Sequence, residues 1–147
     1  MKQSGRTDFF VTAALALACM AAPNAWAKGP GKAVMTPVAE LKWSDAGIPG
    51  VATAGADGDM KKGASHFFLK YAAGFVAPLH HHSPDHHAVV VSGNLVLISG
   101  GKETRLAPGS YFAFKDKAAH AARCEGAQDC VMFIDARGRW DVVASGK

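Results

Sequence analysis

The sequence predicts an all-β protein, a sandwich or a barrel of short strands. Stretches rich in branched and aromatic residues recur about every 8 to 12 residues, and Gly, Pro, Asn or Asp separate them. Helical periodicity does not persist anywhere after residue 27. The chain has 147 residues, of which 49% are hydrophobic and 19% are charged. These values predict one domain with a packed core.

Residues 1–27 are predicted to be a signal peptide. Lys2 and Arg6 give it a positive start, residues 9–22 form its apolar run, and the AWA that ends it is a small-x-small cleavage site. The run is too short and too rich in alanine for a good membrane span. Cys19, which follows LALA, offers a lipid anchor as the alternative. Cleavage after the AWA predicts a periplasmic or secreted protein without membrane contact.

Two cysteines, Cys124 and Cys130, remain in the chain after this cleavage. They flank EGAQD, a short turn between two strand-like stretches. An even number of cysteines in an oxidising compartment favours a disulfide. We therefore expect a disulfide across the mouth of a hairpin, and a metal or redox role is the alternative.

Residues 28–50 are predicted to form an N-terminal arm that packs Leu41 and Trp43 against another part of the chain, and residues 51–147 form the predicted barrel. At the start of the barrel, the ADGD and KKG clusters mark turns between short strands. Further along, Gly93-Asn94 has the pattern of a hairpin turn. The remaining strand-like stretches, in chain order, are SHFFLKY, HAVVVS, LVLIS, KETRL, YFAF, AAHAARC and VMFIDARGRWDVV, the last of which holds two strands.

Five of the seven histidines lie in the stretch HHHSPDHH. Side chains alternate along a strand, so His80 and His82 share one face. The SPD that follows breaks this strand, and His86 begins the next one. Two histidines on one strand and a third after a tight turn can place three imidazoles on one ion. His120 lies between alanines, which leave room around it for a fourth ligand.

The remaining histidines are not expected to bind this ion. His81 and His87 alternate to the opposite faces and are predicted to be exposed bystanders. His66, between Ser65 and Phe67, has the pattern of a residue at the edge of the core. A solvated surface loop and a pH sensor built from clustered histidines are the alternative interpretations of the cluster.

The stretch around the histidines resembles the first motif of the cupin superfamily. That motif runs glycine, five residues, His-x-His, three or four residues, glutamate, six residues, glycine. Here Gly74 is followed by FVAPL, by His80-x-His82, by SPD, by His86, by HAVVVS and by Gly93. Every spacing fits, and the one departure is histidine in the glutamate position.

The second motif of the superfamily matches less well. It begins at Gly109, and His120 falls in its histidine position. Lys115 and Lys117 replace its proline and glycine, and Cys124 replaces its asparagine. The resemblance covers roughly residues 51–143, and the chain is similar in particular to small, exported, ChrR-like cupins of undetermined activity.

This resemblance implies a jelly-roll β-barrel that holds one divalent metal. The implied ligands are His80, His82, His86 and His120, and Asp85 is the rival of His86. Imidazole ligands suit a transition metal such as Fe, Mn, Ni, Cu or Zn rather than Mg or Ca. Because the four imidazoles carry no charge, the ion would keep its full charge and favour an anionic ligand.

Two functions are compatible with these expectations, and whether the chain is an enzyme stays open. One is a metal-dependent, dioxygenase-type enzyme that acts on a small organic acid or diketone. The other is a non-catalytic module that binds or senses a metal or a small ligand, which the scarcity of acid–base groups favours. The three glutamates after residue 27, Glu40, Glu103 and Glu125, lie in turn-like or arm segments, and Tyr71 and Tyr111 offer phenols.

Other partners are predicted from charge and from analogy. The net charge of +4 is modest and its lysines and arginines are scattered, so nucleic acid is not an expected partner. A small molecule is the expected ligand. By analogy with cupins, the arm with Trp43 could join two barrels into a homodimer.

Overall fold

The computed structural model describes residues 32–146, and the residues from Val34 onward form one compact unit. The predicted signal peptide lies outside the described residues, as does the start of the predicted arm. No helix in the described part is long and apolar enough to cross a membrane. That part consists of strands, connecting segments and one 3-10 turn, η1 (Val38–Glu40), so the all-β prediction is confirmed.

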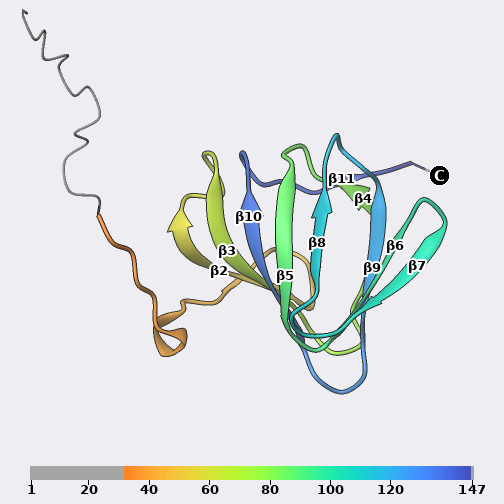
Figure 1. Ribbon diagram of the computed structural model, residues 1–147, viewed down its shortest axis with the longest axis horizontal. Coiled ribbons are helices and arrows are strands. Elements are labelled where there is room, and N and C mark those ends of the chain that lie inside the picture. Colours follow the sequence, from red (N-terminus) through yellow and green to blue (C-terminus); the bar gives the residue numbers. More distant parts are fainter. Residues whose placement is uncertain (1–31, 147) are drawn as a thin grey trace, which may run out of the picture. The chain divides into compact units, whose positions relative to one another are not determined.

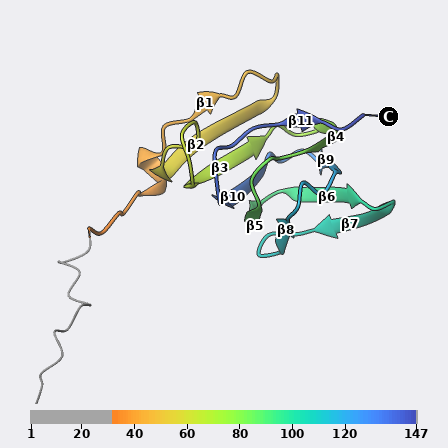
Figure 2. The ribbon, with the colours of Figure 1, turned by 90° about the horizontal axis from the view of Figure 1, so that it is seen from above.

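Two antiparallel sheets make up this unit (Figure 1). The larger sheet contains, in spatial order, β1 (Ser44–Asp45), β2 (Val51–Gly58), β3 (Ser65–Tyr71), β10 (Cys130–Ala136), β5 (His86–Ser92) and β8 (Tyr111–Phe114). The smaller sheet contains β11 (Val143–Ala144), β4 (Val76–His81), β9 (His120–Glu125), β6 (Asn94–Ser99) and β7 (Lys102–Leu106). Figure 2 shows β2 and β3 of the larger sheet apart from β6 and β7 of the smaller one.

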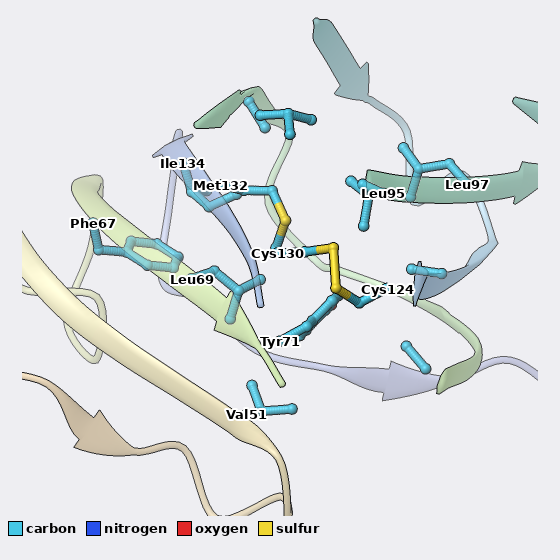
Figure 3. Close-up of a cluster of buried hydrophobic side chains, with 14 of the residues drawn as sticks. Val51, Phe67, Leu69, Tyr71, Leu95, Leu97, Cys124, Cys130, Met132 and Ile134 are labelled. Atoms are coloured by element: carbon cyan, nitrogen blue, oxygen red, sulfur yellow. A yellow bond between two sulfur atoms is a disulfide. The ribbon is translucent and has the colours of Figure 1, made fainter. Parts of the chain in front are cut away.

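The core is built from the alternate residues of both sheets. In β3 and β10 every second side chain is buried, as the period of a half-buried strand requires. Phe67 and Leu69 of β3, Ile134 of β10 and Leu95 of β6 belong to one cluster (Figure 3). Each such side chain stabilises the fold by about 1.5–3 kcal/mol when it is fully buried. The predicted alternation in β5 is confirmed, because His86, Ala88 and Val90 are all buried.

Cys124 and Cys130 form a disulfide, with 5.7 Å between their Cα atoms (Figure 3). The predicted bond is confirmed, but the predicted hairpin is wrong. Cys124 lies on β9 of the smaller sheet and Cys130 begins β10 of the larger sheet. The same turn residues serve a hairpin and a crossing between sheets, so the sequence could not distinguish them. The disulfide therefore ties the two sheets together.

The expected hairpin at Gly93-Asn94 is also a crossing between sheets. β5 belongs to the larger sheet, whereas β6, which begins at Asn94, belongs to the smaller one. Gly93 has a φ of 78°, and a Cβ there would lie 2.6 Å from the carbonyl oxygen of Asp129 and 2.7 Å from the Cα of Cys130. The close approach of the chain that follows β9 therefore requires glycine at this crossing.

The predicted arm adds a short strand to the edge of the larger sheet. β1 pairs with β2, with Ser44 opposite Thr53. The ring of Trp43 lies under the Nζ of Lys70, 4.7 Å away, so its packing partner is a side chain of β3. The turns expected early in the barrel are partly wrong, because β2 continues through the first of them as far as Gly58.

Candidate metal centre

An extra residue in β4 turns His80 toward the interior. Ala77 of β4 pairs with Ala122 of β9, and His80 pairs with His120. Between these two pairs β4 therefore spans three residues and β9 only two. This β-bulge leaves Pro78 and Leu79 exposed in succession and puts Ala77 and His80 on the buried side. Simple alternation from Ala77 would have turned His80 outward. Proline suits the bulge because it has no N–H to donate to the neighbouring strand.

The four predicted ligands come from two sheets and are all buried. His80 is near the end of β4, His82 follows that strand, His120 begins β9 and His86 begins β5 of the other sheet. His80 and His120 are paired across β4 and β9, whose ribbons lie side by side in Figure 1. None of the four is more than 6% exposed.

Three of the histidines converge on one point. One ring nitrogen from each of His80, His82 and His120 lies within 4.8 Å of the other two. No other group of three or more His, Cys, Asp or Glu side chains converges in this way among residues 32–146. His86 is adjacent to the group, with its ring centre 4.8 Å from that of His82 and 6.1 Å from that of His120.

Backbone carbonyls fix the tautomer of these three histidines. The Nδ1 atoms of His80, His82 and His120 donate to the carbonyl oxygens of Pro78, Asp141 and Ala118, at 2.7, 2.5 and 3.0 Å. A carbonyl oxygen only accepts, so the proton of each neutral ring lies on Nδ1. The lone pair of each Nε2 is left for a metal, which is the usual arrangement of a metal-binding histidine.

Burial keeps three of the four histidines neutral. Loss of water lowers the pKa of His82 to about 3 and the pKa of His86 and of His120 to about 4, and neighbouring imidazoles act in the same direction. At neutral pH these rings are therefore uncharged and able to coordinate. Neutral imidazoles with free Nε2 atoms fit a divalent transition metal, so the donor set matches the ion that the sequence predicts.

His86 differs from the other three in its hydrogen bonding. Its Nδ1 and the Oγ of Ser65 are the buried side-chain polar atoms that lack a partner in the described part of the chain. The nearby Pro84 carbonyl opposes the lowered pKa without making a hydrogen bond of normal geometry. A buried nitrogen without a hydrogen-bond partner lowers the stability of a fold by about 1–3 kcal/mol. His86 is thus held near the cluster with no protein partner for this atom.

The rival ligand Asp85 and the two bystander histidines are engaged elsewhere. The Asp85 carboxylate accepts a hydrogen bond from the backbone N–H of Asp116 at 3.0 Å and is not part of the converging group. His81 bonds the hydroxyl of Ser145 and His87 that of Tyr111, at 3.0 and 2.5 Å. Both lie outside the converging group, and both are of intermediate exposure, whereas the sequence analysis predicted exposed side chains.

Aromatic rings enclose the histidines. Phe114 stacks on His120, with 3.7 Å between ring centres and 4° between planes. Trp140 stacks on His82 at 3.9 Å and meets His86 edge-on at 5.0 Å. Neither contact was predicted from the sequence, because each joins residues from separate elements.

Two spaces adjoin the cluster. An interior cavity of about 20 Å³, room for about one water, is lined by His82, His86 and His120 among others. A groove of about 1160 Å³ reaches His80 and His82 from the side of the arm, β2 and β4. Leu69, Tyr71, His82 and Trp140 line both spaces. A ligand in the groove can therefore approach the histidines.

Acid–base groups near the cluster are few. Burial raises the pKa of Tyr71 to about 12, so this phenol stays protonated. Glu103 and Glu125 were expected in turn-like segments but lie on β7 and β9, where they pair with Arg105 and Arg123. This pairing places both carboxylates in an ionic group of their own, so they supply no base to the histidines.

Comparison with known proteins supports the class that this fold and site define. Two antiparallel sheets around a buried group of histidines define a cupin-like jelly roll. Residues 67–135 match the family model described as a cupin domain. Comparison with curated protein sequences gives no significant match.

Solved structures of other proteins have a similar fold. They include KdgF from Halomonas sp. (22% identity, TM-score 0.59, covering 69% of this chain and 93% of that one). The polyketide cyclase RemF from Streptomyces resistomycificus matches with 16% identity and a TM-score of 0.64, over 80% of this chain and 87% of that one. The DMSP lyase DddQ from Ruegeria pomeroyi DSS-3 matches with 18% identity and a TM-score of 0.60, over 74% and 64%. Residues 67–135 of the chain therefore form a domain of the cupin superfamily.

Proposed function

We propose that the protein is an exported, metal-binding cupin that acts as a dioxygenase-type enzyme on a small organic acid or diketone. One observation carries the metal-binding part: three buried histidines present converging nitrogens while carbonyls hold the protons on Nδ1. A bound transition metal would supply Lewis-acid or redox chemistry at this point. The site offers such an ion neutral ligands, an aromatic enclosure and access from a groove.

We propose His86 as the fourth ligand. Its buried, unpartnered Nδ1 and its position beside His82 support this assignment, because a ligand role would account for a polar ring in an apolar enclosure. With four neutral ligands the ion keeps its full charge. A negatively charged group on the substrate is then favoured over a neutral one.

The groove supports a substrate that joins this anionic group to an apolar body. Its walls include apolar and aromatic side chains, among them Ile48, Met60, Phe75 and Trp140. Its volume is enough for a small ligand. The histidines would bind the ion, and the apolar walls would orient the rest of the substrate and exclude water.

A second candidate is a non-catalytic module that binds or senses a metal or a small ligand. The scarcity of acid–base groups favours it, because Asp85 and Asp141 are engaged in hydrogen bonds with backbone N–H groups and Tyr71 holds its proton. Such a protein would bind its metal and ligand without turnover. The two candidates share the same site and differ only in chemistry.

Metal analysis of the untagged protein tests the common part. We expect about one equivalent of Fe, Mn, Ni, Cu or Zn per chain, lost in His120→Ala and retained in the control His66→Ala, whose ring lies outside the converging group. Loss in His86→Ala as well would support the fourth ligand. Absence of metal from the unaltered protein after reconstitution would overturn the metal site.

Oxygen uptake separates the two candidates. With Fe, Mn, Ni or Cu bound, an oxygenase should consume oxygen on addition of a small organic acid or diketone, and His80→Ala should abolish the uptake. Binding of the same compounds without uptake under any metal would favour the binding module.

Homodimer formation also remains part of this proposal. The arm exposes apolar side chains, with Met35 and Val38 85% and 84% exposed, and a second copy could cover them. Sedimentation analysis should then show a dimer that dissociates when the arm is removed.

A further inference from the structure

His82 is held differently from the other two converging histidines. It lies one residue beyond the end of β4, so the sheet does not fix its backbone. His80 and His120 each donate to a carbonyl two residues earlier in the chain. The hydrogen bond of His82 instead goes to Asp141, 59 residues further along the sequence. The orientation of His82 therefore depends on a distant segment.

Trp140, the residue before Asp141, fixes the plane of the His82 ring. The two rings stack with 3.9 Å between their centres and 22° between their planes. Trp140 is itself anchored, because its backbone N–H donates to the carbonyl of Met60 at 2.8 Å and its ring meets Phe67 edge-on at 5.1 Å. A ring anchored from two sides limits the rotation of the imidazole beneath it.

Asp141 makes a second bond that holds its carbonyl in place. Its carboxylate accepts the backbone N–H of Ser83 at 2.7 Å, so Asp141 bonds both His82 and the residue that follows it. Directly afterwards, Val143 pairs with His81 as β11 joins the edge of β4. Residues 140–144, which lie far from His82 in the sequence, thus hold the end of β4 in place.

We propose that Trp140 and Asp141 are positioning residues for the metal centre. Asp141 fixes the Nδ1–H tautomer of His82, and Trp140 fixes its ring plane, so that Nε2 faces His80 and His120. This inference rests on the proposed metal site and adds the segment that completes it. Loss of partners that orient a ligand typically lowers metal affinity by about 10- to 100-fold.

Two variants test this inference, each with a matched control. Trp140→Leu removes the stacked ring, and Trp43→Leu makes the same change on the arm. Asp141→Ala removes the bond to Ser83, and Asp129→Ala removes a similar carboxylate bond, to the backbone N–H of Ala73 at 3.0 Å. Asp141→Asn should keep the metal affinity of the unaltered protein, because an amide oxygen can still accept a hydrogen bond from the backbone N–H of Ser83.

The first measurement is the dissociation constant for Co²⁺ or Zn²⁺, with the Co²⁺ absorption spectrum as a report on ligand geometry. We expect Trp140→Leu and Asp141→Ala to weaken binding by about 10- to 100-fold and to alter the spectrum. The two controls and Asp141→Asn should stay within about threefold of the unaltered protein. Unchanged affinity and spectrum in both test variants would overturn the inference.

The second measurement needs no metal. Nitrogen NMR of the metal-free protein distinguishes the Nδ1–H from the Nε2–H tautomer of a neutral histidine. We expect His82 to hold the Nδ1–H tautomer in the unaltered protein and to exchange between tautomers in Asp141→Ala. If the unaltered protein binds no metal, the proposed function fails, but this spectrum still decides the inference. A single Nδ1–H tautomer in Asp141→Ala would contradict it.

Discussion

Replacing Gly93 by alanine should be among the most damaging single changes in the described fold. The φ of 78° is a left-handed conformation, which costs a residue with a Cβ about 1–2 kcal/mol. The new Cβ would also lie 2.6 Å from the Asp129 carbonyl oxygen and 2.7 Å from the Cα of Cys130. These are backbone atoms, so relief requires the segment before β10 and the segment after β5 to move apart, and overpacking of this kind costs about 1–3 kcal/mol. We expect a total loss of about 2–5 kcal/mol in the free energy of unfolding.

A second glycine separates the two causes. Gly101 has nearly the same φ, 76°, but a Cβ there would meet nothing within 4 Å. Gly101→Ala should therefore lose only the conformational cost, about 1–2 kcal/mol. Urea denaturation followed by circular dichroism measures both values. Equal losses in the two variants would refute the close approach of the segment before β10 to the end of β5.

Four further predictions concern the disulfide, pH, the bulge and the leader. Reduction of Cys124–Cys130, whose sequence separation is 6, should cost about 2 kcal/mol in urea denaturation, and an unchanged midpoint would contradict the loop-closure reasoning. Because burial lowers the pKa of His82 below its value in the unfolded chain, the unfolded state binds more protons below about pH 6.5. Metal-free protein should therefore lose stability as the pH falls from 7.5 to 5, by up to about 1.4 kcal/mol per pH unit for His82 alone; constant stability would show that water reaches the histidines. Deleting Leu79 removes the bulge and leaves one residue between Ala77 and His80, so alternation should still turn His80 inward and metal analysis should show that metal is retained, whereas loss of metal would show that the bulge itself positions His80. Sequencing of the protein from the periplasm or medium should begin at Lys28, and a retained N-terminus would contradict the signal peptide.

The alternation of side chains made most strands predictable, but not their assignment to sheets. β5, β8 and β10 follow the expected stretches closely. The connections at Gly93 and at EGAQD were expected as hairpins and are crossings between sheets. Turn residues report only that the chain reverses. The choice of neighbour depends on contacts between distant strands, such as β10 between β3 and β5, and local sequence does not encode them.

The candidate site was predictable to the extent that its ligands are local. The spacing of His80, His82 and His86 is visible in eight residues, and His120 could be placed through the resemblance to the cupin motifs. The residues that orient these ligands could not be predicted from the sequence. The inward direction of His80 depends on a bulge that alternation alone would not predict. Trp140 meets His82 only because a segment from the end of the chain crosses the end of β4.

The four histidines are not equivalent in what holds them together. His80 and His120 are paired across β4 and β9, and His82 directly follows β4, so all three belong to one sheet. His86 lies on the other sheet, and its distance from them depends on how the two sheets pack. An ion held by all four would therefore link the two sheets at this point, as the disulfide does between β9 and β10. Bound metal should stabilise the folded protein in either case, because it binds the native and not the unfolded chain, and it should stabilise it more when His86 adds a fourth ligand.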